Sequence, residues 1–204
     1  MIGIINIGMG NLTSVYNALN YLQIPNRIIS NPSDIYKCHR IILPGVGAYG
    51  EAMRILVKLG FNMELQEFAL NRQQPVLGIC LGMQLLLQSS TEHGFNAGLN
   101  FIDGQVHYLG DNAINLPIPH IGWNEVFTTK DSLLFNGINE AERTFYFVHS
   151  YYCRIDDHSL IKGQAHYGFD FDAMFEAENI FGVQFHPEKS QQSGLKLLQN
   201  FSLF

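Results

Sequence analysis

Short apolar runs alternate with helix-like segments through the first half of the chain, and this alternation restricts the fold more than any other feature. Strand-like runs occupy residues 2–7, 27–30, 40–43 and 76–79. Segments with apolar residues three to four positions apart lie between or after these runs, with the clearest at residues 51–59 and 81–89. Apolar strands that alternate with helices predict a parallel sheet with helices on both faces.

The second half of the chain has a different pattern. Strand-like segments follow one another with few helices between them, at residues 101–109, 125–128, 145–152, 160–167 and 174–185. Short polar links between several of these segments favour antiparallel pairing. A helix over about residues 194–201 is predicted to close the chain. Because we find no repeat and no long linker in the 204 residues, we expect a single α/β domain over residues 1–204.

Composition and charge exclude several classes of protein. Hydrophobic residues make up 47% of the chain and charged residues 15%, which is enough apolar material for a large core. The net charge is −6 and no basic run is present, which argues against a nucleic-acid-binding protein. The N-terminal segment lacks a basic region, and its apolar run is too short for a signal peptide or a membrane span. We therefore expect no membrane partner. The three cysteines lack metal-type spacing, so we expect no metal site and a reduced, cytoplasmic setting.

Cys80 lies where a predicted strand runs directly into a predicted helix. The surrounding pattern is Gly-x-Cys-x-Gly, formed by Gly78 and Gly82, and it corresponds to a nucleophile elbow. A cysteine at a helix N-terminus is favoured as the thiolate, and the amide of Leu81 can donate to an oxyanion there. A lone cysteine is more commonly a buried structural residue, but the flanking glycines favour the catalytic interpretation. The other two cysteines have no such setting and are predicted to be structural: Cys38 and Cys153.

His186 is the candidate base. It ends an apolar strand, and Pro187 biases it towards an extended conformation, in which Glu188 faces the same side. A carboxylate beside the imidazole would fix its tautomer and stabilise its protonated form. The alternative is an ordinary ion pair in a surface turn. The remaining histidines are interpreted as structural or solvent-exposed: His120 and His149 as structural, and His39, His93, His107, His158 and His166 as exposed or satisfied in the core.

Together these residues resemble the triad-type, class I glutamine amidotransferases. The order Cys80, His186, Glu188 matches that family, as do the motifs GICLGMQ and GVQFHPE. Within the family the chain is similar to the glutaminase subunits of imidazole glycerol phosphate synthase. This similarity is carried by GMGNL at residues 8–12, LPGVGAYG at 43–50, PHIGWNEV at 119–126, FYFVHSYY at 145–152 and GVQFHPEKS at 182–190. It implies a flavodoxin-like class I glutamine amidotransferase fold, with a mostly parallel central sheet flanked by helices and a partly antiparallel region in the second half.

The resemblance also implies roles for further residues. Val46 would supply a second amide to the oxyanion hole beside Leu81, and Glu92 would bind the α-ammonium group of the substrate. The positions that would grip glutamine are Gly47, Gln84, Glu92 and Ser150. Those at the partner interface would be Asn11, Trp123, Tyr146 and Lys189. Four of these residues have a plainer alternative: Gln84 on a helix surface, Glu92 as a solvated loop charge, Trp123 as a half-buried aromatic in a Gly-Trp-Asn turn, and Lys189 as a solvated lysine.

The implied reaction is hydrolysis of L-glutamine to glutamate and ammonia, with no metal or organic cofactor. The glutaminase pattern covers nearly the whole chain, so the ammonia acceptor is expected on another protein. The resemblance implies a heterodimer with a (β/α)8-barrel cyclase that makes imidazole glycerol phosphate and an aminoimidazole-carboxamide ribotide in histidine biosynthesis. It further implies that the glycine-rich oxyanion strand is misoriented until the cyclase binds its own substrate. Glycine tolerates positive φ, so such a peptide can flip at low steric cost.

Other functions stay open at this point. A paralogous glutaminase subunit that supplies ammonia for amidation of a surface sugar would share the same chemistry, and Ile121 and Gln191 are compatible with it. A flavodoxin-like domain with an elbow cysteine also occurs in peptidases, redox sensors and chaperone-like proteins. The complete His-Pro-Glu run and the Pro-Gly-Val-Gly strand argue against these. A pure binding module would require that Cys80→Ser removes no activity.

Overall fold

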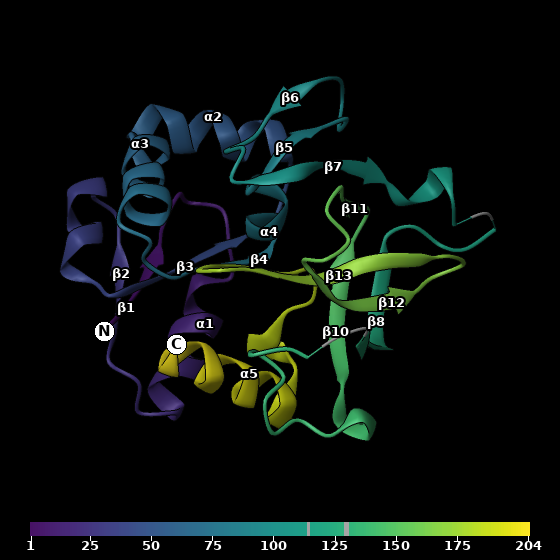
Figure 1. Cartoon of the computed structure of the whole chain (residues 1–204). Helices are drawn as coiled ribbons and strands as arrows, with labels where there is room; N and C mark the ends of the chain where they lie inside the picture. The colour runs from purple at the N-terminus through teal and green to yellow at the C-terminus, as the bar shows by residue number, and fades with distance from the viewer. Residues whose placement is uncertain (114, 129–130) are drawn as a thin grey trace.

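A computed structural model of the chain describes residues 1–113, 115–128 and 131–204. Five parallel strands form one half of the main sheet, in the order β2-β1-β3-β4-β14. Figure 1 shows these strands between two groups of helices. Their bounds are Ile2–Ile5 for β1, Asn26–Ile29 for β2, Arg40–Gly45 for β3, Val76–Cys80 for β4 and Ile180–Val183 for β14.

The main sheet continues with strands that are mostly antiparallel, in the order β14-β13-β11-β7-β5-β6. Strand β12 pairs with β13 and β9, while β8 and β10 form a separate antiparallel pair. The bounds are Leu87–Ser90 for β5, Asn96–Ala97 for β6, Ile102–Tyr108 for β7, His120–Glu125 for β8, Phe127–Thr128 for β9, Thr144–His149 for β10, Tyr151–Ile155 for β11, Ile161–His166 for β12 and Asp170–Ala177 for β13. The predicted fold class, with its partly antiparallel second half, is confirmed.

Helices cover both faces of the parallel strands. Figure 1 shows α2 and α3 on one face and α1 and α5 on the other. The bounds are Leu12–Tyr21 for α1, Tyr49–Leu59 for α2, Phe61–Gln66 for α3, Leu81–Leu85 for α4 and Gln191–Leu203 for α5, with a π-helical turn at Glu67–Asn71. A six-residue 3-10 helix lies at Pro32–Lys37, and single 3-10 turns lie at Leu109–Asp111, Glu140–Glu142 and Pro187–Lys189.

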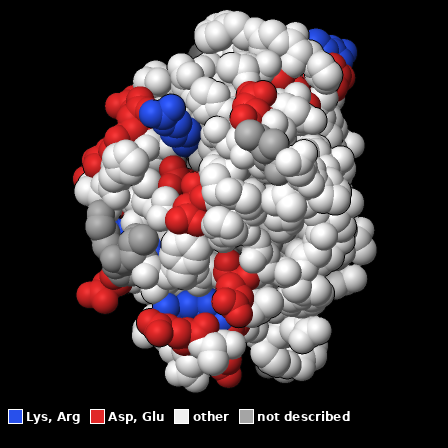
Figure 2. All heavy atoms as spheres, turned by 90° about the vertical axis from the view of Figure 1, so that its right-hand side faces the viewer, with Lys and Arg blue, Asp and Glu red and all other residues white. Residues whose placement is uncertain are grey.

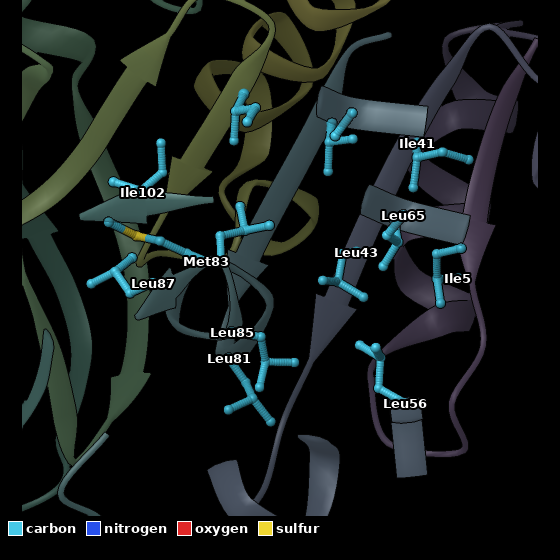
Figure 3. Close-up of a cluster of buried hydrophobic side chains, with 14 of the residues drawn as sticks. Ile5, Ile41, Leu43, Leu56, Leu65, Leu81, Met83, Leu85, Leu87 and Ile102 are labelled. Carbon is cyan, nitrogen blue, oxygen red and sulfur yellow. The ribbon is translucent and has the colours of Figure 1, made fainter. Parts of the chain in front are cut away.

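The alternation of side chains along the strands produces two separate cores. Ile5 and Leu43 point into the cluster under α2, α3 and α4, which is drawn in Figure 3. Their neighbours Ile4 and Ile42 belong to the opposite cluster, which includes Leu197 of α5. All of these side chains are fully buried, and each contributes about 1.5–3 kcal/mol on transfer from water. The two cores hold the strands rigidly, and the site described below is built at their ends.

Several segments differ from their predicted structure, among them the predicted strand over residues 125–128, which is divided between the end of β8 and β9. The predicted helix over residues 81–89 ends at Leu85, and β5 begins at Leu87. Leu85, Leu86 and Leu87 are all fully buried, whereas consecutive residues of a helix point to different sides and seldom all reach the core. The predicted strand over residues 145–152 is interrupted at Ser150, which separates β10 from β11 in another sheet. The segment at residues 174–185 contains the end of β13, a turn and β14.

The surface carries little basic charge on the face that lies to the right in Figure 1. Figure 2 shows this face, on which acidic side chains (red) are widespread and basic side chains (blue) are few. The distribution agrees with the net charge of −6. Among the described residues, no helix has the length and apolar character needed to cross a membrane.

Candidate active site

The carboxyl ends of three neighbouring parallel strands meet at one point of the sheet. Gly45, the last residue of β3, is in register with Cys80, the last residue of β4. On the other side of β4, Ile79 is in register with Val183, the last residue of β14. Active sites of open α/β sheets form at the carboxyl ends of the strands. The topology therefore brings the segments that follow Gly45, Cys80 and Val183 together.

Cys80 adopts the strained backbone expected of a nucleophile elbow, with φ +53° and ψ −111°. The two glycines of the motif permit this turn. A Cβ atom on Gly82 would lie 1.7 Å from the carbonyl oxygen of Leu43, and one on Gly78 would lie 2.6 Å from the carbonyl oxygen of Gly82. The predicted need for close backbone approach at both glycines is confirmed. Such strain is concentrated at functional sites, where the surrounding structure holds it.

The sulfur of Cys80, which is 6% exposed, interacts with the imidazole of His186 and lies near two further polar groups. The side-chain amide of Gln184 lies 3.6 Å away and donates to sulfur, and the carbonyl oxygen of Val148 lies 3.9 Å away. Gln184 is fully buried and accepts a 3.0 Å hydrogen bond from Gln84. Sequence reasoning assigned no role to Gln184. Its signal was its position two residues before His186 on an extended segment, which places both side chains on one face.

His186 and Glu188 form the predicted pair, although Pro187–Lys189 is a 3-10 turn and not the extended run that was expected. The Nδ1 atom of His186 lies 2.8 Å from Oε1 of Glu188, and both side chains are 1% exposed. Asn11 donates a longer hydrogen bond of 3.4 Å to the same carboxylate oxygen. Asn11 was expected at a partner interface, and the structure places its amide on the carboxylate of the triad. That contact was not expected from the sequence.

The electrostatic setting of His186 favours its protonated form. Burial opposes charge on the imidazole, but interactions with the Cys80 thiolate and the Glu188 carboxylate outweigh burial and raise its pKa. The other ring nitrogen, Nε2, is buried and has no hydrogen-bond partner among the described residues. A protonated imidazole beside the Cys80 sulfur can deliver a proton to a leaving group.

A pocket of about 310 Å³ opens over Cys80 and collects the other predicted site residues. It is lined by Val46, Gly47, Cys80, Leu81, Gln84, Glu92, Pro119, Val148, His149, Ser150 and Tyr151. The predicted oxyanion residues and the predicted substrate-binding residues therefore surround one cavity with the nucleophile. Gly47 has φ +108°, a conformation that favours glycine.

Gln84 and Glu92 are not ordinary surface residues. Gln84 is 5% exposed and its amide donates a 3.0 Å hydrogen bond to the carbonyl oxygen of Tyr151. The interpretation of Gln84 as a helix-surface residue is therefore wrong. Glu92 is half-buried, and its Oε2 accepts a 2.6 Å hydrogen bond from the amide of Tyr49, the first residue of α2. This bond fixes the Glu92 carboxylate at the pocket wall.

Three of the four residues expected at a partner interface form one exposed cluster. Trp123 is 48% exposed and its ring stands edge-on to Tyr146, with centroids 6.1 Å apart. The ammonium of Lys189 lies 5.5 Å from the centre of the Tyr146 ring. Trp123 lies within β8, directly opposite Tyr146 of β10, and the expected Gly-Trp-Asn turn is absent because both strands pair throughout this segment. Binding of a partner at this cluster stays a prediction.

A strained cysteine at the end of a central parallel strand, beside a buried histidine–glutamate pair, defines a class I glutamine amidotransferase. The family model described as glutamine amidotransferase class-I matches residues 4–203, and the chain belongs to this family.

Relatives of known name narrow the similarity. The chain is 46% identical over 202 residues to a Campylobacter jejuni (subsp. jejuni serotype O:23/36, strain 81-176) protein named imidazole glycerol phosphate synthase subunit HisH 1, which covers 99% of both chains. It is 40% identical to a Leptospira borgpetersenii protein named imidazole glycerol phosphate synthase subunit HisH, again over 99% of both. The fold is also that of a solved structure titled PurLQS from Thermotoga maritima, at a TM-score of 0.76, 17% identity and coverage of 98% of this chain and 96% of that one.

Proposed function

We propose that this chain is the glutaminase subunit of an imidazole glycerol phosphate synthase, in histidine biosynthesis. It hydrolyses L-glutamine to glutamate and ammonia, and the ammonia passes to a cyclase subunit. Two observations together support the proposal. The chain is 46% identical, over nearly its full length, to a protein of that name. It also contains the strained Cys80 and the buried pair of His186 and Glu188. The family model over residues 4–203 supports a glutaminase role for the whole described chain and a single domain.

The first half of the reaction breaks the side-chain amide of glutamine. The Cys80 thiolate attacks the carbonyl carbon, and the resulting oxyanion receives hydrogen bonds from the amides of Leu81 and Val46. Each preorganised donor of this kind lowers the activation barrier by about 2.7–4 kcal/mol. The protonated His186 then gives its Nε2 proton to the nitrogen that leaves as ammonia. A γ-glutamyl thioester on Cys80 remains.

The second half of the reaction releases glutamate. Neutral His186 takes a proton from a water molecule, which attacks the thioester carbonyl. The carbon–sulfur bond breaks, glutamate leaves and the thiolate of Cys80 is restored beside the reprotonated imidazole. Glu188 stays ionised throughout and holds the imidazole in the tautomer that exposes Nε2. The electrons and protons balance within these groups and water, so the chain's own residues suffice for each step.

Four residues of the pocket hold the substrate in this proposal. The Glu92 carboxylate, already fixed by the amide of Tyr49, binds the α-ammonium group. Gln84, Gly47 and Ser150 contact the rest of the molecule, and all of them line the pocket with Cys80. A carboxylate on the wall of a partly closed pocket selects an amino acid over a simple amide, because it offers a partner to a positive charge.

The partner is a (β/α)8-barrel cyclase that docks on the cluster of Trp123, Tyr146 and Lys189, with Asn11 close to the same face. Aromatic residues that are exposed and already ordered are frequent anchors of protein interfaces. In the proposal, binding of the cyclase and its substrate orients the Pro-Gly-Val-Gly segment for catalysis. The proposal includes a cytoplasmic location, supported by the free thiols of Cys38, Cys80 and Cys153.

The proposal is tested by a glutaminase assay on the purified chain, alone and with the candidate cyclase and its ligand. Glutamate release that rises strongly when the loaded cyclase is added supports it, and labelling of Cys80 by a reactive glutamine analogue identifies the nucleophile. Equal rates with and without the cyclase would contradict activation by the partner. Glutaminase activity that responds only to a cyclase-like protein of sugar amidation would assign the chain to that pathway. Oxidation of Cys80 without labelling would indicate a redox sensor instead.

A further inference from the structure

Two buried histidines, His120 and His149, face one another behind the pocket. His120 begins β8 and His149 ends β10, and the two residues are paired across these strands. Nδ1 of His120 lies 3.0 Å from Nε2 of His149. Their exposed fractions are 3% and 6%. His149 lines the pocket beside Ser150, whereas His120 is not among the residues that line it. The proposed reaction assigns no role to either ring.

The hydrogen bonds around the pair fix both tautomers. The carbonyl oxygen of Tyr151 lies 2.8 Å from Nδ1 of His149, so Nδ1 of His149 carries the proton and Nε2 accepts. Nδ1 of His120 must then donate to it, which leaves Nε2 of His120 as an acceptor. The amide nitrogen of Asn124 lies 3.4 Å from this Nε2 atom and donates to it. All donors therefore point in one direction, from Asn124 through both rings to Tyr151.

The origin of this chain of hydrogen bonds is rigid. The amide nitrogen of Asn124 also donates to the carbonyl oxygen of His166 at 2.8 Å, and its oxygen accepts from the amide of Glu125 at 2.9 Å. The amide group therefore cannot be reversed without the loss of both bonds. The ring of His120 is stacked on Tyr167, with ring centres 4.1 Å apart, and on Phe147 at 5.0 Å.

Both rings are neutral at neutral pH, because each is buried. Burial lowers the pKa of His120 to about 4. Burial lowers the pKa of His149 to about 3, and repulsion from His120 and His186 adds to the effect. A proton added to Nε2 of His149 would point at the N–H of His120, so the chain of hydrogen bonds requires both rings to be neutral.

The far end of the chain is a wall of the pocket. Tyr151 accepts from His149 and also from the amide of Gln84, so one carbonyl joins the two groups. The wall runs from Val148, whose carbonyl oxygen lies 3.9 Å from the sulfur of Cys80, to Tyr151. Ser150 lies within this stretch and lines the pocket. The two histidines therefore hydrogen-bond to this wall from behind, and the amide of Leu109 also donates to the carbonyl oxygen of Ser150 at 2.9 Å.

We propose that His120 and His149 are positioning residues for glutamine binding, which hold the wall at residues 148–151 so that Ser150 meets the substrate next to Cys80. The inference rests on the proposed glutaminase function. It assigns no proton transfer to the pair. Its consequence is a split between KM and kcat: a broken chain weakens the grip on glutamine and leaves the chemistry of Cys80 and His186 in place.

Two amide substitutions at residue 120 separate this role from a general loss of packing. In His120→Asn the amide nitrogen takes the place of Nδ1 and keeps a donor for His149. In His120→Gln the amide takes the place of Nε2, and the donor towards His149 is lost. Both side chains are neutral amides, so a difference between the variants reports the hydrogen bond. His39→Asn, at an exposed histidine far along the chain, is the matched control.

Steady-state kinetics are measured on the complex with the cyclase subunit, after titration of active sites with a reactive glutamine analogue. We expect His120→Gln to raise the KM for glutamine roughly tenfold, as for the loss of one partner of a buried donor–acceptor pair, with kcat per active site changed less than about threefold. His120→Asn should stay within about threefold of the parent KM, because it keeps the donor. His39→Asn should match the parent.

Two results overturn the inference. Equal KM values for His120→Asn and His120→Gln would show that the hydrogen bond to His149 does not position the pocket wall. A fall in kcat per active site with unchanged KM would assign the pair to catalysis and not to positioning of the pocket wall. If the unmodified complex hydrolyses no glutamine, the proposed function fails and the inference fails with it. An active parent without the KM split overturns the inference alone.

Discussion

The side-chain amide of Asn11 lies 3.4 Å from the carboxylate oxygen of Glu188 that also accepts from His186, although the two residues are 177 positions apart. Asn11 is held in turn by Ser14, whose hydroxyl donates to its oxygen at 2.7 Å. The loop at residues 8–12 is therefore tied to the active site through a carboxylate. Because the same loop lies next to the proposed docking face, the contact joins that face to the triad.

Substitution of Asn11 should reduce turnover in a graded way. Asn11→Ala removes one long hydrogen bond to Glu188, and we expect kcat to fall about threefold to tenfold. Asn11→Asp has the same shape but places a second carboxylate against Glu188, so its activity should fall further. The measurement is glutaminase kinetics in the complex, with binding of the cyclase measured separately. An aspartate variant as active as the parent would show that the contact does not support Glu188.

Removal of either charged partner should lower the pKa of His186. The imidazole is deeply buried, and only its interactions with Cys80 and Glu188 hold the pKa above the ordinary value. In Cys80→Ala and Glu188→Gln one of these interactions is lost while burial remains, so each variant should shift the titration to lower pH. Imidazole NMR signals followed against pH provide the measurement. An unchanged titration of His186 in Cys80→Ala would contradict the proposed ion pair between the Cys80 thiolate and the His186 imidazolium.

Gly82→Ala should destabilise the chain severely, because the new methyl group would lie 1.7 Å from the carbonyl oxygen of Leu43. The backbones of α4 and β3 cannot move apart cheaply, and we expect a loss of roughly 3 kcal/mol or more in the free energy of unfolding. Gly94→Ala is the comparison. It has φ +112° and nothing within 4 Å of the new Cβ, so only backbone strain of about 1–2 kcal/mol applies. Denaturant unfolding that ranks the two variants equally would contradict the elbow geometry.

Acid should destabilise the fold through the two buried histidines. The pKa of His120 is lowered to about 4 in the folded chain from 6.5, so between these values the unfolded chain binds a proton that the folded chain does not. Stability is therefore fully present above about pH 6.5 and falls as the pH drops towards 4, by about 1.4 kcal/mol per pH unit for each such histidine. His120→Asn should flatten this slope in denaturant titrations. A parent and variant with identical slopes would show that His120 is not buried in its neutral form.

The sequence patterns were sufficient for the elements that depend on local information. The apolar runs that became β1, β3 and β4, the amphipathic helix α2, and the Gly-x-Cys-x-Gly elbow all follow from periodicity and from sterics near Cys80. Local patterns were insufficient where tertiary pairing decides. Three successive leucines at residues 85–87 look helical, but the end of α4 and the start of β5 are set by a strand partner at Ile102 that the local pattern does not contain.

The contacts within the site also divide into those that local sequence predicts and those that depend on tertiary pairing. The contact between His186 and Glu188 was predicted from an extended His-Pro-Glu run, but only His186 is extended, and a 3-10 turn at Pro187–Lys189 brings the carboxylate to the imidazole. The contacts of Gln184 with Cys80, and of Asn11 with Glu188, join residues 104 and 177 positions apart and require the strand order to be known. The link between His120 and His149 likewise depends on the register of β8 and β10, which no local pattern specifies.

The central claim is that Cys80 forms a covalent bond to the substrate with His186 as its proton donor. Rapid quenching of the complex during turnover of glutamine, followed by peptide mass spectrometry, tests this most directly. We predict a γ-glutamyl adduct on the peptide that contains Cys80, absent in Cys80→Ser and absent from the peptides of Cys38 and Cys153. Sustained glutamate release with no adduct on Cys80, or an adduct on another cysteine, would contradict the account.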